Sequence, residues 1–324
     1  READADVTEA IDHCRYYAEQ IERIESRPRL RNLPGEDNML VYSPKGVCSV
    51  ISPYAFPLSI LTGMTTAALA AGNTVVVKPA SQASVIASKF INILHEVGLP
   101  PGVVNFVSGS GERLGLPLVE HADVNLVAFT GSARVGTNVI GSGAVVRPGQ
   151  SFIKKMIVEM GGKNAIIVDD DADLDGAVQA IVDSAFAFAG QKCSSCSRLI
   201  VLGGVYDALC SRLSDAVNSI PIGPAEEPMT MTGPVIDETA VARIQQYIEL
   251  ARNEGKVFVQ AQLPRNCDQG FFVPPTVVTD ISPRSNVSQE EIFGPVLAVH
   301  AAPDFDAALR IANETRYALT CGLF

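Results

Sequence analysis

One cysteine of this chain lies in a segment whose composition suits nucleophilic chemistry. The stretch FAGQKCSSC, residues 188–196, ends an Ala-rich helical segment with Gly-Gln-Lys and then presents Cys193. A thiol in a polar position beside a lysine can have a lowered pKa and attack an electrophile. Cys193 and Cys196 also form a C-x-x-C pair, but the chain has only four His and no second pair, so the zinc signal is weak. Three interpretations stay open here: a nucleophile, an inert buried thiol, and a metal or redox ligand.

A carboxylate that could work beside such a thiol is Glu159. It ends an apolar strand-like run and precedes two glycines in VEMGGK, residues 158–163. We expect a partly desolvated position, and desolvation raises a carboxylate pKa towards the range of a general base. The alternative is an ordinary exposed glutamate at the end of a strand.

Three further segments have residue types that bind nucleotides. Lys78 follows an apolar strand, and ligands of open α/β sheets bind at carboxyl ends of strands; the alternative is a solvated lysine. The turn at residues 129–132 (FTGS) joins a strand to a helix and could hold a phosphate on its backbone N–H groups. Gly109 and Gly111 open another helix but do not match G-x-G-x-x-G, so either turn could be a plain connection.

A pair of acids, Glu290 and Glu291, precedes Phe293 and a Gly-Pro turn. Such a pair could contact a sugar hydroxyl. By itself the segment is equally typical of a helix end or a turn.

The elements that must position these residues alternate between strands and helices. An opening amphipathic helix has apolar residues at three- and four-residue steps from Val7 to Ile21, and Pro28, Pro34 and Gly35 end it. Helices are predicted at residues 58–71, 84–97, 174–189, 206–217, 239–253 and 305–315. Strands are predicted at residues 39–52 (around a Pro-Lys-Gly turn), 74–79, 103–107, 125–131, 155–162, 165–168, 197–202 and 295–302. This alternation favours a doubly wound α/β fold with a mostly parallel sheet.

Composition excludes several classes of function. With 25 Lys and Arg against 36 Asp and Glu, the formal charge is −11, so nucleic acids and anionic membranes are poor partners. No apolar run approaches the length of a membrane span, and the acidic start lacks a secretory signal. Seven scattered cysteines favour a reducing compartment over a disulfide framework.

Taken together and in this order, the segments resemble the aldehyde dehydrogenase superfamily, from about residue 40 to the last residue. Five motifs carry the resemblance: KPAS (78–81), FTGS (129–132), EMGGK (159–163), GQKC (190–193) and EIFGP (291–295). Within the superfamily the sequence is most similar to the Δ1-pyrroline-5-carboxylate (glutamate-γ-semialdehyde) dehydrogenases. The same module also occurs fused to proline dehydrogenase in proline-utilisation proteins. The passages that suggest this branch include VVRPGQ (145–150), QQYIELARNEGK (245–256) and QEEIFGPV (289–296).

The resemblance implies an NAD(P)-dependent oxidation of an aldehyde through a cysteine thioester, with glutamate γ-semialdehyde as substrate and glutamate as product. Cys193 would be the nucleophile, Glu159 would activate the hydrolytic water, and Ser194 would help to bind the substrate carboxylate. NAD would be the cofactor, with NADP tolerated and no metal. Its binding residues would be Lys78 for the adenosine ribose, Ser81 beside it, Gly109 and Gly111 on the adenine side, Ser132 for the pyrophosphate, and Glu291 with Phe293 for the nicotinamide end.

The fold implied is a Rossmann-like cofactor domain over residues 1–160, with an N-terminal helix and linker at 1–39, and a catalytic domain over 161–324. The chain stops at Gly322-Leu323-Phe324 as it enters a strand, which predicts a truncated catalytic domain whose C-terminal part is missing. The family also implies a homo-oligomer and a small aldehyde as ligand. The missing signals and the free thiols fit bacterial cytoplasm or the mitochondrial matrix as location.

Two residues depart from the family pattern. Ala55 stands where the family carries an Asn that donates to the oxyanion, and losing one such donor can cost roughly 10²–10³ in rate. Ser81 stands where many NAD-preferring members carry Glu, which leaves cofactor preference open. A catalytically impaired nucleotide-binding homologue or fragment is therefore the alternative function.

Overall fold

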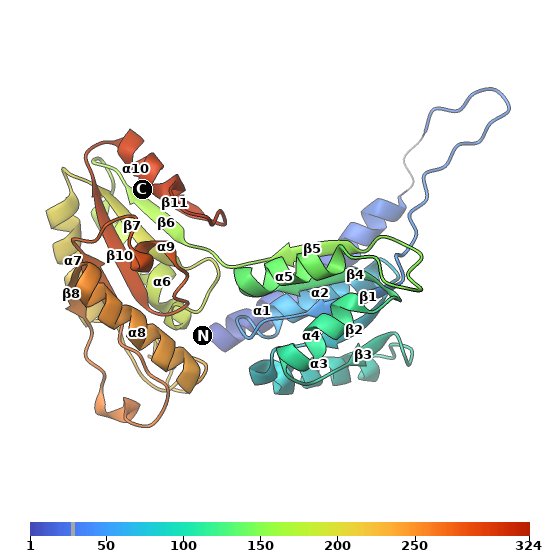
Figure 1. Ribbon diagram of the computed structural model, residues 1–324, viewed down its shortest axis with the longest axis horizontal. Coiled ribbons are helices and arrows are strands. Elements are labelled where there is room, and N and C mark those ends of the chain that lie inside the picture. The colour runs from blue at the N-terminus through green and yellow to red at the C-terminus, as the bar shows by residue number, and fades with distance from the viewer. Residues whose placement is uncertain (27–29) are drawn as a thin grey trace. The chain divides into compact units, whose positions relative to one another are not determined.

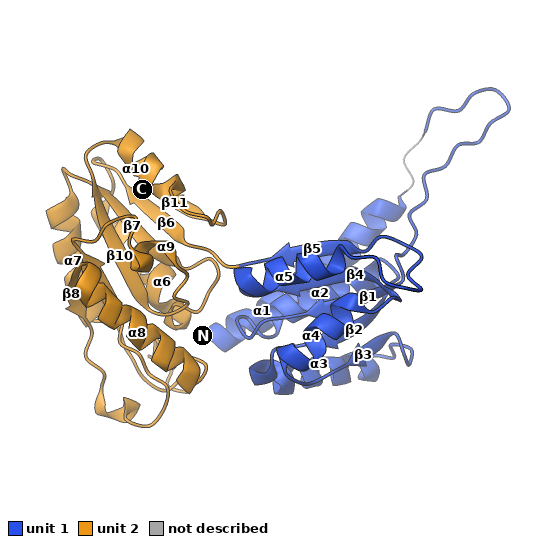
Figure 2. Ribbon diagram, viewed as in Figure 1, with its two compact units in different colours: residues 1–160 blue, residues 161–324 orange. Residues whose placement is uncertain are grey.

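The computed structural model describes residues 1–26 and 30–324; the predicted helix break at Pro28 lies outside the described residues. The chain divides into two compact units, Arg1–Met160 and Gly161–Phe324 (Figure 2). Each unit is built around its own sheet, and the predicted α/β class with mostly parallel strands is confirmed in both (Figure 1).

The first unit contains a five-stranded sheet in the order β3-β2-β1-β4-β5, with every neighbouring pair parallel. Its strands are β1 (Val47–Ile51), β2 (Thr74–Lys78), β3 (Val104–Phe106), β4 (Val124–Thr130) and β5 (Lys155–Glu159). Its helices are α1 (Glu2–Glu25), α2 (Ser59–Ala70), α3 (Ser84–Glu96), α4 (Gly111–Glu120) and α5 (Ala133–Gly143).

Helices cover both faces of this sheet. Successive strand residues point to opposite sides, and apolar residues on both sides need a covering helix. Val50 of β1 packs with α2 and α3 in one cluster, whereas the next residue, Ile51, packs with Val119 of α4 and Val139 of α5 in another. The order of strands reverses between β1 and β4, and open α/β sheets bind ligands beyond the carboxyl ends of strands at such a point. The unit therefore has the topology of a doubly wound sheet with its switch point between β1 and β4.

Helix α1 is attached to the rest of the unit through a buried carboxylate. Asp6 accepts the backbone N–H groups of Leu58 and Ser59, at 3.1 and 3.0 Å, and so caps the N-terminus of α2 from a different helix. We expect Asp6→Ala to lower the free energy of unfolding by about 1–3 kcal/mol, because it leaves buried donors without an acceptor. Urea denaturation checks this, with the exposed Asp12→Ala as matched control; equal stability of the two variants would contradict the capping role.

The second unit contains a six-stranded sheet in the order β11-β6-β7-β10-β9-β8. All neighbours are parallel except β8 and β9, which run antiparallel. Its strands are β6 (Asn164–Val168), β7 (Cys196–Leu202), β8 (Lys256–Gln260), β9 (Thr276–Thr279), β10 (Val296–Ala302) and β11 (Cys321–Leu323). Its helices are α6 (Leu174–Phe186), α7 (Tyr206–Asn218), α8 (Glu238–Glu254), α9 (Asn286–Gln289) and α10 (Phe305–Asn313).

The second sheet is also covered on both faces. Leu199 and Val201 of β7 pack in one cluster with α6 and α7, while Ile200 and Leu202 pack in another with α10. Helix α8 packs through Ile244 and its neighbours against residues from β9 and β10. Residues 321–323 form β11, the strand that the sequence predicts at the end of the chain.

Two local predictions were wrong, and two strands were missed. Residues 39–45 form no strand in the described structure, and apolar side chains there such as Val41 are exposed. The helix predicted at 174–189 ends at Phe186, because Phe188 and Ala189 take left-handed backbone angles. Strands β8 and β9 were not predicted; β8 has the polar ends Lys256 and Gln260, which weaken the apolar pattern.

Candidate active site

The candidate residues of the second unit lie at the end of its sheet where the amino ends of the parallel strands meet. The loops before β6, β7, β10 and β11 contain Gly162, Cys193, Glu291 and Thr320 respectively. These four strands are neighbours and parallel, in the order β11-β6-β7-β10, so their amino ends meet. Segments far apart in sequence are thereby placed side by side.

The loop that presents Cys193 depends on an unusual backbone. Phe188, Ala189 and Gly190 have φ values of 60°, 51° and 67°, three consecutive residues in the left-handed region. At Gly190 a Cβ would lie 2.4 Å from the carbonyl oxygen of Gly294, so a glycine is required there. The Cys193 loop therefore packs directly on the backbone of the segment that presents Glu291.

Asn164 fixes the chain on both sides of the cysteine. Its Nδ2 donates to the carbonyl oxygens of Cys193, at 2.7 Å, and Ser195, at 2.9 Å. Its Oδ1 accepts the backbone N–H of Thr320 at 3.0 Å. Gly162 leaves room for this arrangement, since a Cβ there would lie 2.5 Å from the carbonyl oxygen of Cys193. One amide side chain thus orders three of the four loops.

The two cysteines of the C-x-x-C pair lie in different environments. Cys193 is half-buried, whereas Cys196 is a buried, free thiol that starts β7, and burial raises its pKa to about 12. A thiol with so high a pKa is a poor nucleophile and a poor metal ligand at neutral pH. Among residues 1–26 and 30–324, no group of three His, Cys, Asp or Glu side chains is arranged to hold a metal ion.

Glu291 is held by the glycine pair that precedes β6. Its Oε1 accepts the backbone N–H of Gly162 at 3.1 Å, and a Cβ on Gly161 would lie 2.1 Å from its Oε2. Burial raises the pKa of Glu291. The hydrogen bond from Gly162 and the positive charges of Lys163 and Arg243 favour the ionised form and partly oppose this rise. The carboxylate is half-buried with spare acceptor capacity, which suits hydroxyl donors.

Lys163, between the glycine pair and Asn164, is buried, and its Nζ has no hydrogen-bond partner within the described structure. Burial, followed by the nearby charge of Arg198, lowers its pKa from 10.5 to about 7. The unfolded chain therefore binds more protons between about pH 7 and 10.5, and this residue makes stability rise with pH across that window.

We expect Lys163→Met to raise the free energy of unfolding at pH 7 by on the order of 2 kcal/mol, because a buried, unpaired amine is removed. The gain should shrink as the pH rises from about 7 towards 10.5, because the lysine of the unfolded chain then also loses its proton and folding no longer requires deprotonation. Urea denaturation at several pH values measures this. A gain that is the same at every pH would show that Lys163 does not titrate as described.

In the first unit, Lys78 lies at the carboxyl end of β2 and is buried, so the alternative of a solvated lysine is wrong. Its Nζ donates to the carbonyl oxygen of Pro79 at 2.7 Å, and burial lowers its pKa. Ser81 Oγ donates to the carbonyl oxygen of Gly109 at 3.4 Å, which brings two predicted residues together. This group lies at the edge where a doubly wound sheet binds nucleotides.

Both predicted glycine turns of this unit precede helices with capped N-termini. Ser132 caps α5 by accepting the N–H of Val135 at 3.4 Å, and Ser110 caps α4, next to Gly111. Ser194 and Phe293 belong to the second unit; Ser194 is exposed beside Cys193, and Phe293 has a left-handed backbone with φ of 56°. These residues thus divide between the two units: Lys78, Ser81, Gly109, Gly111 and Ser132 belong to the first, and Cys193 and Glu291 to the second.

Glu159 differs from its predicted environment. It was expected to be partly desolvated, but its side chain is exposed at the end of the edge strand β5. An edge strand has a neighbour on one side only, here β4, so its final side chain stays open to water. Ala55, in contrast, is buried, and it precedes Phe56, whose φ is 46°.

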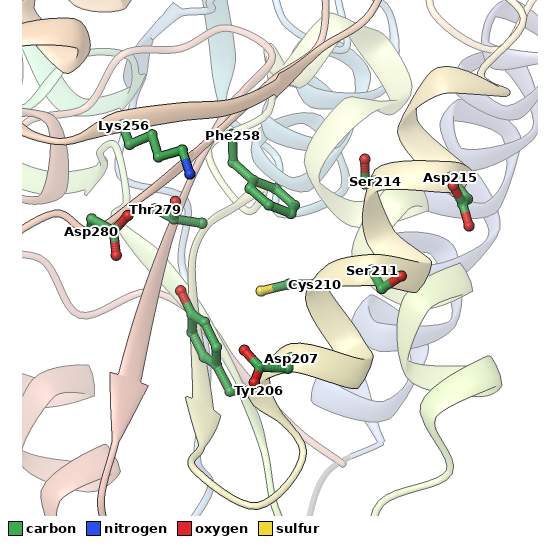
Figure 3. Close-up of a pocket in the computed structure, with 10 residues that line it drawn as sticks. All are labelled: Tyr206, Asp207, Cys210, Ser211, Ser214, Asp215, Lys256, Phe258, Thr279 and Asp280. Carbon is green, nitrogen blue, oxygen red and sulfur yellow. The ribbon is translucent and has the colours of Figure 1, made fainter.

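A pocket of about 380 Å³ lies elsewhere in the second unit (Figure 3). It is formed by one face of α7 together with β8 and the end of β9, and none of the candidate residues lines it. The lining residues are Tyr206, Asp207, Cys210, Ser211, Ser214, Asp215, Lys256, Phe258, Thr279 and Asp280. Separately, none of the helices in the described part of the chain is both long and apolar enough to cross a membrane.

Sequence reasoning missed several residues that shape this site. Asn164, Thr320, Arg243 and Tyr247 act through hydrogen bonds to segments distant in sequence. Only Asn164 had a signal, since it directly follows the Gly-Gly-Lys run before a buried strand.

A family model described as the aldehyde dehydrogenase family matches residues 1–324. This chain belongs to the aldehyde dehydrogenase family. It is 48% identical over 320 residues to the 1-pyrroline-5-carboxylate dehydrogenase of Anoxybacillus flavithermus, covering 99% of this chain and 62% of that protein. It is 46% identical to 1-pyrroline-5-carboxylate dehydrogenase 2 of Halalkalibacterium halodurans, with the same coverage of 99% and 62%.

Solved structures of aldehyde dehydrogenases have the same fold. The 1-pyrroline-5-carboxylate dehydrogenase from Thermus with bound NAD matches with a TM-score of 0.96 and 44% identity, over 100% of this chain and 62% of that one. Proline utilization A from Bdellovibrio bacteriovorus matches with a TM-score of 0.97 and 49% identity, over 100% of this chain and 33% of that one. The chain thus spans 62% of the length of the curated relatives it matches.

Proposed function

We propose that this chain is part of an NAD-dependent dehydrogenase that oxidises L-glutamate γ-semialdehyde, derived from Δ1-pyrroline-5-carboxylate, to glutamate. The observation that carries the proposal is the meeting of the Cys193 loop and Glu291 at one sheet edge, through the glycine pair and Asn164. The names of relatives at 46% and 48% identity support this substrate.

The residues present fit a nicotinamide dinucleotide. A buried Lys78 and the Ser81–Gly109 pair lie where a Rossmann-like sheet binds the adenosine end. The half-buried Glu291 carboxylate accepts one backbone N–H and has capacity left for a ribose diol. Ser132 at the N-terminus of α5 would face the pyrophosphate. The Thermus relative was solved with bound NAD, which supports the same choice here.

The roles follow from the chemistry of each group. When bound, the nicotinamide would supply a hydride acceptor. Cys193 Sγ would bond to the aldehyde carbon and hold the acyl group as a thioester after oxidation. Glu159 would take the proton of the water that hydrolyses this thioester and releases glutamate. Ser194, exposed beside the nucleophile, would donate to the substrate carboxylate.

The test is turnover of glutamate semialdehyde with NAD⁺ by the full-length protein, followed by the absorbance of reduced nicotinamide. We expect steady turnover, and a higher kcat/KM than for an aldehyde of similar length without the α-amino acid group. Equal kcat/KM for both aldehydes would contradict the substrate, and no reaction with any aldehyde would contradict the dehydrogenase. Because Ser81 provides no carboxylate to repel a 2′-phosphate, NADP⁺ should also be accepted, with NAD⁺ preferred.

A second candidate function, a nucleotide-binding homologue with impaired turnover, is favoured by Ala55. Its buried methyl group has no donor for an oxyanion. If this alanine limits the rate, Ala55→Asn in the full-length protein should raise turnover, and an unchanged rate would show that another group supplies the donor. We further propose that the protein forms homo-oligomers and works alone or fused to proline dehydrogenase.

A further inference from the structure

The segment that presents Glu291 and Phe293 is bound through hydrogen bonds by one helix, α8. Arg243 and Tyr247 are one turn apart on α8, and therefore lie on the same face of the helix. Both are half-buried, and both donate hydrogen bonds to residues 290–293. Neither was singled out by the sequence or given a role in the proposed function.

Arg243 binds two consecutive backbone carbonyl groups of this segment. Its Nε donates to the carbonyl oxygen of Ile292 at 3.2 Å, and its Nη2 donates to that of Phe293 at 3.5 Å. Ile292 lies between Glu291 and Phe293, so one guanidinium fixes the backbone from which both side chains project. The charge of Arg243 also favours the ionised form of Glu291 and so opposes the burial that raises its pKa.

Tyr247 holds the start of the same segment. Its hydroxyl donates to Oε2 of Glu290, and burial together with this bond raises the pKa of Tyr247 to about 12. The phenol therefore stays protonated, and the bond intact, throughout the neutral range. Glu290 is thereby turned towards α8, while Glu291 is directed to Gly162.

The segment needs this support because its backbone is strained and tightly packed. Phe293 has a φ of 56°, a conformation that costs a bulky residue on the order of 1–3 kcal/mol. At Gly294 a Cβ would lie 2.5 Å from Cδ1 of Ile244, the α8 residue beside Arg243. Such a conformation persists only where surrounding contacts enforce it, and the contacts named here come from α8.

We propose that Arg243 and Tyr247 are positioning residues that set the affinity for the nicotinamide end of the dinucleotide by fixing Glu291 and Phe293, without touching the cofactor. The inference rests on the proposed function, since it takes Glu291 and Phe293 as nicotinamide-side ligands. It assigns α8 to a function that concerns only one end of the ligand. The adenosine end is expected to bind to residues of the first unit.

The experiment compares two nucleotides on the full-length protein. NAD⁺ has the nicotinamide riboside and ADP lacks it, including the ribose assigned to Glu291, and calorimetry gives a dissociation constant for each. Arg243→Met keeps the aliphatic stem but removes both hydrogen bonds, and should weaken NAD⁺ binding about tenfold while ADP binding changes less than about twofold. Arg243→Lys should recover part of the loss, because one donor is restored.

Two further variants complete the comparison. Tyr247→Phe removes a single hydroxyl from a residue that otherwise keeps its packing, and should weaken NAD⁺ binding about threefold with an unchanged melting temperature. Arg252→Met is the matched control, because Arg252 lies on the last turn of α8 and bonds only to Glu249 and Gln260 among the contacts described. It should alter neither affinity.

The outcomes separate the two ideas. If the wild type binds NAD⁺ and both Arg243→Met and Tyr247→Phe bind it equally well, the positioning role is overturned and the proposed function stands. Equal loss of NAD⁺ and ADP binding would also overturn it, because it would indicate a general structural role. A wild type that binds neither nucleotide overturns the proposed function together with this inference.

Discussion

Replacing Cys193 with alanine is expected to lower aldehyde turnover by at least about 10⁴-fold, because removing the nucleophile of a covalent mechanism leaves only binding and electrostatic contributions. The dissociation constant for NAD⁺ should stay within about twofold of the wild-type value, because the thiol is not a group that the dinucleotide needs for binding. Stopped-flow absorbance of reduced nicotinamide measures the rate, and calorimetry measures the affinity.

The matched control is Cys196→Ala, three residues further along. Cys196 is buried at the start of β7, where burial raises its pKa to about 12. Its removal should cost some stability but leave turnover nearly unchanged. Turnover that survives in Cys193→Ala and disappears in Cys196→Ala would show that Cys196, and not Cys193, is the nucleophile. Loss in both variants alike would instead favour a dithiol mechanism.

Replacing Glu159 with glutamine is expected to separate oxidation from hydrolysis. If Glu159 activates the hydrolytic water, the variant should still form about one reduced nicotinamide per active site in a first burst. Steady turnover should then fall by roughly 10²–10⁴-fold, the usual contribution of a general base.

Pre-steady-state absorbance at a known enzyme concentration gives the amplitude of the burst. Glu96→Gln, another exposed glutamate of the first unit at the end of α3, is the control and should show wild-type progress curves. A Glu159→Gln variant with an undiminished steady rate would exclude Glu159 as the base. A Glu159→Gln variant without any burst would show that Glu159 acts before the thioester forms.

The elements of the fold were predictable because their signals are local. Buried parallel strands such as TVVVK at β2 are short apolar runs, and the helices between them have apolar residues at helical spacing. The wrong predictions arose where tertiary context decides. Residues 39–45 have apolar side chains but no strand, and β8 forms despite polar ends because β9 supplies its hydrogen bonds.

The candidate site was only partly predictable, for the same reason. Its motifs are local, but the bond from Gly162 to Glu291 joins residues that are 129 positions apart. That contact depends on the strand order β11-β6-β7-β10, which brings four amino ends together and cannot be inferred from spacing. The exposure of Glu159 likewise follows from β5 being an edge strand, not from the apolar residues around it.

The central claim is that Cys193 forms a covalent thioester with the oxidised substrate. Mass spectrometry of the Glu159→Gln variant, quenched with acid soon after mixing with glutamate semialdehyde and NAD⁺, tests it most directly. We predict one added glutamyl group per chain, located on the peptide that contains Cys193 and absent when NAD⁺ is omitted. A glutamyl group on any other residue, or a completed burst of reduced nicotinamide with no adduct at all, would contradict the account.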